Sequence, residues 1–106
     1  MKAASRASLI ILALVPAFSA YTIADGTADT FKSRCAPCHG ATGAGDTTLG
    51  KNLKLRDLGS ANVQKQPDDE FTTIISKGKG KMPAYERKLS KQQIDDLVKL
   101  IRSLKK

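Results

Sequence analysis

Apolar residues recur along this chain at the spacing of helices rather than that of strands. The pattern is clearest near the C-terminus, where apolar residues at every third or fourth position form one stripe with charged residues between them. The stripe consists of Ile94, Leu97, Val98, Ile101 and Leu104. Ser90 and Gln93 precede it as a capping box, and Leu89 and Ile94 are placed as a hydrophobic staple. We therefore predict a C-terminal helix that packs this stripe into the core.

The region before this helix is predicted to contain shorter helices joined by glycine-rich loops. Ala28, Phe31 and Cys35 recur at steps of three and four, which places them on one face of a first helix capped by Asp25. Residues 40–58 contain several glycines and are expected to form a loop. The leucines expected to line a cavity from this loop are Leu49, Leu53, Leu55 and Leu58.

A middle helix is also indicated by its end signals. Ser60 is a candidate cap for a short helical turn, and Pro67 suits the first position of the helix that follows. Three acidic residues, 68–70, favour the N-terminus of that helix, and Gly78 is expected to end it. Because no stretch alternates apolar and polar residues for long, an all-α fold is predicted.

The N-terminal residues have the order of a secretory signal peptide: two basic residues, an apolar stretch over residues 9–18, and then small residues. Cleavage after Ser19 and cleavage after Ala24 are both compatible with these residues. We predict a signal peptide over residues 1–24 and a periplasmic or otherwise exported protein. An uncleaved membrane anchor is the alternative, but the apolar stretch is shorter than the roughly 20 residues of a spanning helix, and Pro16 interrupts it.

Residues 25–106 are expected to form a single domain, because a chain of 106 residues leaves no room for a second one. A domain of this size buries only a modest apolar core and often needs a metal or cofactor for stability. The chain has no Trp and few other aromatic residues. We expect a buried planar cofactor to supply the missing apolar bulk.

The candidate chemistry lies in Cys35-Ala36-Pro37-Cys38-His39, which contains both cysteines and the single histidine of the chain. This is the attachment motif of a c-type haem. Two thiols three residues apart can each form a thioether to one haem, and the adjacent imidazole can then reach the iron. We therefore predict one haem c, bound covalently through Cys35 and Cys38 and ligated by His39.

Other interpretations of this motif fit less well. A structural zinc site usually has four Cys or His ligands, whereas only three candidates exist here. A thioredoxin-like redox pair needs neighbouring strands, which the sequence does not predict. A disulfide across a two-residue gap would close a very short loop and add little stability.

The second axial ligand of the iron has fewer candidates. No second histidine exists, so Met, Lys, Tyr or water remain. Once a signal peptide is removed, the only methionine is Met82, in a glycine-flanked loop where Pro83 favours extended backbone before it. Met82 is the preferred ligand. Core packing of its side chain and an open iron are the alternatives.

Together these features resemble the class I bacterial cytochromes c over residues 25–106. The resemblance rests on the haem motif and the glycine after it, on residues 82–85 with the sequence Met-Pro-Ala-Tyr, and on the C-terminal helix. It implies a small all-α domain wrapped around one covalently attached haem. It also implies that the first and last helices cross, with Gly26 and Phe31 meeting the C-terminal stripe.

One position departs from the family pattern. Many members have Gly-Pro-x-Leu after the haem motif, whereas this chain has Lys51 in place of the proline. In the family, a backbone carbonyl at this point accepts a hydrogen bond from the ligand histidine, and such a bond orients the imidazole. We expect the acceptor to remain in Gly50 or Lys51 and the loop to be less rigid.

The predicted ligand set indicates a function. An iron ligated by protein on both sides cannot readily bind oxygen or peroxide, so we expect single-electron transfer between redox partners rather than catalysis. Two alternatives remain open. One is a haem sensor with a labile Met82 ligand, and the other is a haem subunit docked permanently to a dehydrogenase or oxidase complex.

The charge of the chain bears on its partners. The formal net charge is +8, and loss of Lys2 and Arg6 with the signal peptide leaves +6. A basic cluster, opposed only by Glu86, surrounds Met82 and comprises Lys77, Lys79, Lys81, Arg87 and Lys88. We expect it to attract an electron donor or acceptor with an acidic docking surface, and a merely solvated surface is the alternative. Nucleic acid is not expected as a partner, and membrane contact is expected only through a redox partner or an uncleaved signal peptide.

Overall fold

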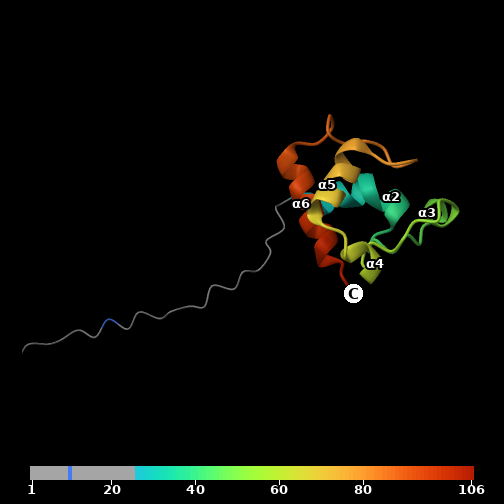
Figure 1. Cartoon of the computed structure of the whole chain (residues 1–106), viewed down its shortest axis with the longest axis horizontal. Helices are drawn as coiled ribbons and strands as arrows, with labels where there is room; N and C mark the ends of the chain where they lie inside the picture. The colour runs from blue at the N-terminus through green and yellow to red at the C-terminus, as the bar shows by residue number, and fades with distance from the viewer. Residues whose placement is uncertain (1–9, 11–25) are drawn as a thin grey trace, which may run out of the picture.

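A computed structural model describes residue 10 and residues 26–106 of the chain (Figure 1). The described helical segments are α1 (Thr27–Thr30), a π-helix (Phe31–Cys35), α2 (Ala36–His39), α3 (Thr48–Asn52), α4 (Ala61–Gln64), α5 (Asp68–Lys77) and α6 (Lys91–Ser103). Over these residues the fold is all-α, as predicted, with one isolated β-bridge between Lys79 and Met82. The predicted signal peptide and Asp25 lie outside the described residues, apart from Ile10. No helix in the described part of the chain is long and apolar enough to cross a membrane.

Helix α6 forms as its end signals and stripe predict. The Ser90 hydroxyl accepts a hydrogen bond from the Gln93 amide, and the Gln93 side chain accepts one from the Ser90 amide, which confirms the capping box. Leu97 is the most buried side chain of the core, at 2% exposure. One charged residue departs from the expected pattern, because Asp96 is buried. Its carboxylate accepts a hydrogen bond from the Gln92 amide group at 3.0 Å, which offsets part of the cost of burial.

The first helical segment is continuous but irregular. It runs from α1 through the π-helix into α2, and the change of register falls just before Pro37. Proline has no amide hydrogen and its ring clashes with the carbonyl four residues earlier, so we attribute the widened turn to Pro37. The change also alters which side chains share a face. Phe31 is buried and Cys35 half-buried as expected, but Ala28 is exposed and Thr27 takes the buried position instead.

The first and last helices pack together, as the family resemblance implies. Phe31 belongs to the same buried cluster as Leu97 and Ile101. The expectation for Gly26 was wrong, because Gly26 is exposed and a side chain added there would meet no atom within 4 Å. Its φ of +89° explains the glycine instead, since residues with a Cβ rarely adopt that conformation.

The middle of the chain follows the prediction with two differences. The Ser60 hydroxyl caps α4 and Gly78 ends α5, as expected. Pro67 lies one position before α5 rather than at its first residue. The predicted loop over residues 40–58 contains the short helix α3, which the Thr47 hydroxyl caps by accepting a hydrogen bond from the Gly50 amide at 2.9 Å.

Replacing Ser90 with Ala is expected to lower the free energy of unfolding by about 1 kcal/mol, because the first turn of α6 loses its capping acceptor. Urea denaturation followed by far-UV circular dichroism measures this change. Ser33→Ala is the control, since Ser33 is exposed and its hydroxyl bonds only to Thr30 within its own helical segment. A loss in Ser90→Ala no greater than in Ser33→Ala would contradict the role of the cap.

Candidate functional site

A cavity of about 250 Å³ opens between the first helical segment, the middle of the chain, the loop after α5 and helix α6. Its walls are mostly apolar. The lining residues are Phe31, Cys35, His39, Leu55, Arg56, Leu58, Val63, Gln66, Phe71, Ile74, Ile75, Lys79, Met82, Leu97 and Ile101. Three of the four predicted site residues therefore border the same space. The fourth, Cys38, is half-buried and does not line the cavity.

Two of the leucines expected to line a cavity do so. Leu55 and Leu58 contribute to its wall. Leu49 points elsewhere and is 48% exposed, and Leu53 is half-buried outside the lining. The difference follows from α3, because Leu49 lies within this short helix rather than in an extended loop.

The segment that carries Cys38 and His39 is fixed by the loop that follows it. The Thr47 hydroxyl donates to the Cys38 carbonyl at 2.9 Å, and the Gly45 amide donates to the His39 carbonyl at 2.7 Å. Gly50 must lack a side chain, because a Cβ there would lie 2.4 Å from the Cys38 carbonyl oxygen. These contacts hold α2 against α3 and so orient His39 toward the cavity.

Burial sets the protonation of the two candidate groups on this side. It lowers the pKa of His39, which favours the neutral imidazole that can ligate a metal. Burial also raises the pKa of the Cys35 thiol to about 11, while the charge of the neighbouring Arg34 acts in the opposite direction. Both cysteines are unpaired thiols. Their chemistry is compatible with thioether formation.

The expected hydrogen bond from the ligand histidine to the Gly50–Lys51 carbonyls is not made. Nδ1 of His39 is buried and has no hydrogen-bond partner among residues 26–106. The Gly50 carbonyl accepts from the Leu55 amide at 3.0 Å, and the Lys51 carbonyl accepts from the Lys54 amide at 3.1 Å. The carbonyls of Gly50 and Lys51 therefore bond to amides of their own loop and not to the His39 imidazole.

Met82 reaches the cavity from a two-residue turn. The amide of Lys79 donates to the Met82 carbonyl at 3.1 Å, and the Met82 amide donates back at 3.0 Å. Gly80 occupies the first turn position with a φ of +58°, as such tight turns favour. Gly78 permits the close approach, because a Cβ there would lie 2.6 Å from the Met82 carbonyl oxygen. The glycines that flank Met82 thus have a geometric function.

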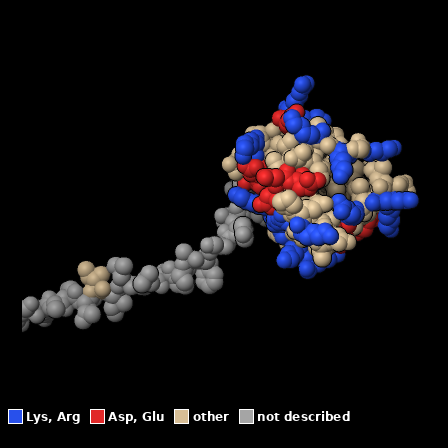
Figure 2. Space-filling view, in the orientation of Figure 1, with Lys and Arg blue, Asp and Glu red and all other residues tan. Residues whose placement is uncertain are grey.

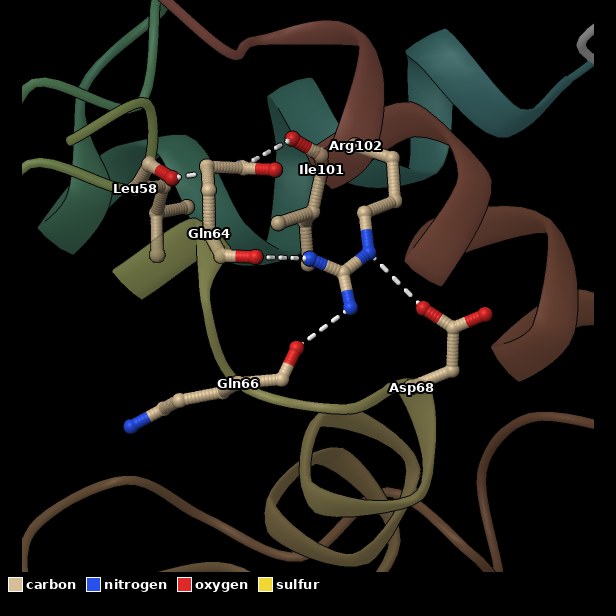
Figure 3. A network of polar contacts seen from close by, with 6 residues as sticks. All are labelled: Leu58, Gln64, Gln66, Asp68, Ile101 and Arg102. Carbon is tan, nitrogen blue, oxygen red and sulfur yellow. Dashed lines mark hydrogen bonds and ion pairs between the residues drawn. The ribbon is translucent and has the colours of Figure 1, made fainter. Parts of the chain in front are cut away.

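One cavity wall is fixed by a polar network that the sequence did not suggest (Figure 3). The Gln64 side-chain amide donates to the Leu58 carbonyl at 2.8 Å and to the Ile101 carbonyl at 2.9 Å. The Arg102 guanidinium donates to the carbonyls of Gln64 and Gln66 at 2.6 Å and 2.5 Å. It also pairs with the Asp68 carboxylate at 2.7 Å.

This network joins residues from three parts of the cavity wall. Leu58, Gln66 and Ile101 all line the cavity, and the side chains of Gln64 and Arg102 connect their backbones. The Arg102 guanidinium also lies 4.5 Å above the ring of Phe71, another lining residue. The sequence carried no local signal for this role, because three of the four carbonyl acceptors lie more than 30 positions from their donors.

The residues present fit a haem. Apolar side chains line most of the cavity, as a planar apolar macrocycle requires. The His39 imidazole, whose Nδ1 has no hydrogen-bond partner in the described part of the chain, and the Met82 thioether both border it. Arg56, Gln66 and Lys79 offer donors for the two carboxylates that a haem carries. A bound haem would supply reversible one-electron chemistry.

A helical domain that brings a Cys-x-x-Cys-His segment and a methionine to one apolar cavity has the architecture of a small c-type cytochrome. Residues 22–101 match the family described as cytochrome c oxidase, cbb3-type, subunit III, and the chain belongs to this family. It is a class I mono-haem cytochrome c with one covalent haem c, and an electron-transfer protein rather than an enzyme.

Individual relatives agree with this assignment. Cytochrome c-555 of Methylococcus capsulatus is 38% identical over 102 residues, covering 91% of this chain and 76% of the relative. A cytochrome c6 of Leptolyngbya boryana is 37% identical over 67 residues, covering 63% of this chain and 75% of the relative. Among solved structures, the KustC0563 c-type cytochrome matches with a TM-score of 0.70 at 29% identity, covering 76% of this chain and 98% of that one.

Replacing Gln64 with Met, which has a similar length, is expected to lower the free energy of unfolding by about 1–2 kcal/mol, because two carbonyls lose their shared donor. Urea denaturation of the haem-loaded protein measures the loss. Lys65→Met is the control, since Lys65 is the exposed neighbour in sequence. Equal stability of the two variants would show that the network does not hold the wall.

Proposed function

We propose that Cys35 and Cys38 bind the haem covalently and that His39 and Met82 are its axial ligands. The observation that carries this proposal is that His39 and Met82, which are 43 positions apart, border one apolar cavity together with Cys35. Neutral imidazole and thioether together form the ligand pair that raises the potential of a c-type haem. With both positions filled, the iron exchanges electrons through the haem edge and has no site for a small substrate.

We also propose that residues 1–24 direct export and that residues 25–106 form the mature domain in the periplasm or an equivalent compartment. The basic N-terminus, the short apolar stretch and the small residues after it support this proposal. Export is also consistent with covalent haem attachment, which takes place outside the cytosol.

The Met82→Ala variant tests the ligand set. It is expected to lose the far-red sulfur-to-iron absorption band of the oxidised protein, to lower the reduction potential and to admit small ligands to the iron, because no other methionine lies in residues 25–106. Absorption spectra and a redox titration measure these changes. A band that survives the substitution, or a high-spin spectrum of the unmutated protein, would contradict ligation by Met82. The second result would favour the ligand-binding sensor.

The proposed partner is a redox protein with an acidic docking surface. Lys and Arg side chains surround much of the face shown in Figure 2, whereas acidic side chains gather mainly near α5 and α6. Within the basic cluster, Lys77 pairs with Glu86 at 2.8 Å, and Lys88 lies over the Tyr85 ring at 5.7 Å. Lys79, Lys81 and Arg87 are exposed, and over residues 26–106 no ion pair involves them.

These three cations adjoin the Met82 turn, and Lys79 itself lines the cavity. A partner's acidic surface would therefore be drawn toward the side where the cavity opens. The paired Lys77 is expected to contribute less, because the Glu86 carboxylate cancels its charge locally.

Charge reversal at Lys79 and Lys81 is expected to slow second-order electron transfer to the native acceptor about tenfold at low salt, with little difference at high salt. Stopped-flow kinetics across a series of ionic strengths measures this. The control is the double variant Lys65→Glu, Lys105→Glu, which has the same change of net charge at two lysines without an ion pair among residues 26–106, near α4 and the C-terminus and away from the Met82 turn (Figure 1). If both double variants transfer electrons at the same rate at low salt, the surface around Lys79 and Lys81 is not part of the docking site.

A second candidate function is permanent docking to a larger redox complex. The family description names an oxidase subunit, which is the observation in its favour. Stable co-purification of the exported protein with a membrane-bound oxidase or dehydrogenase would support this candidate. Isolation as a monomer after mild extraction would favour the diffusing carrier.

A further inference from the structure

Tyr85 links two segments that line the cavity and lie far apart in the sequence, those of Cys35 and Met82. It is buried, at 8% exposure, and lies three residues after Met82. Its hydroxyl donates to the carbonyl of Arg34 at 3.3 Å, and Arg34 directly precedes Cys35. The hydrogen bond therefore joins positions 51 residues apart.

The backbone of Tyr85 is fixed independently of this bond. Its amide donates to the Ile75 carbonyl of α5 at 2.9 Å, and its carbonyl accepts from the Leu89 amide at 2.9 Å. The tyrosine is thus anchored to α5 and to the turn that leads into α6. Its hydroxyl is the polar contact that extends from this anchor to the segment of Cys35 and His39.

Both cavity segments also pack on the core to which Tyr85 belongs. Cys35 and Met82 are half-buried against that core, and both line the cavity. The hydrogen bond is therefore placed to restrain the separation of the two segments.

We propose that Tyr85 is a positioning residue for Met82, whose hydroxyl holds the methionine turn at a fixed separation from the haem-attachment segment. This inference rests on the proposed ligation of the iron by Met82. Loss of the hydroxyl lets the turn move outward more easily, so that an added ligand displaces the methionine sulfur at lower concentration.

Tyr85→Phe tests this role, because it removes the hydroxyl and keeps the buried ring. Imidazole is titrated into the oxidised, haem-loaded protein, and loss of the far-red sulfur-to-iron band reports displacement of Met82. The apparent imidazole affinity is expected to rise by about 2-fold to 12-fold, the range that loss of one hydrogen bond produces.

Ser90→Ala is the matched control, since it also loses one hydrogen bond but lies at the start of α6 and leaves Tyr85 intact. It is expected to reduce stability toward urea without changing imidazole affinity. An unchanged affinity in Tyr85→Phe, or an equal rise in Ser90→Ala, would overturn the proposal. If the unmutated protein lacks the band, ligation by Met82 fails and this proposal fails with it. A normal band with unchanged affinity overturns only the role of Tyr85.

Discussion

The apolar cavity between His39 and Met82 is the constraint on which the rest of this structure depends. A domain of this size buries only a modest apolar core, and its two longest helices, α5 and α6, place apolar residues around the same space. Leu97 and Ile101 of α6 belong both to the buried core and to the cavity lining. The cofactor is therefore part of the core. A bound haem completes packing that the side chains alone leave unfinished.

Fast electron transfer depends on rigid cavity walls. A carrier exchanges electrons quickly when its ligands move little between oxidation states, so the walls need fixed positions rather than adaptable ones. The Gln64–Arg102 network fixes one wall, and the paired hydrogen bonds of Lys79 and Met82 fix the turn that carries the thioether. Polar contacts between distant backbone segments thus support a mostly apolar site.

Local signals in the sequence were enough for the features that depend on neighbouring residues. The capping box of Ser90 and the haem motif are complete within five residues each, and both could be predicted. The π-helix before Pro37 could not, because helical periodicity assumes an unbroken register. The role of Arg102 was also missed, since a charged residue beside an apolar stripe usually indicates solvent exposure, and its partners become visible only when α4 and α6 meet.

Covalent attachment of the haem is the central claim, and the intact mass of the exported protein tests it most directly. The protein is expressed with a functioning haem-attachment system and compared with a Cys35→Ser, Cys38→Ser double variant. We predict that the unmutated protein carries the mass of one haem through denaturation and acid extraction, and that the double variant does not. An unmutated protein with the mass of the bare polypeptide would contradict the account.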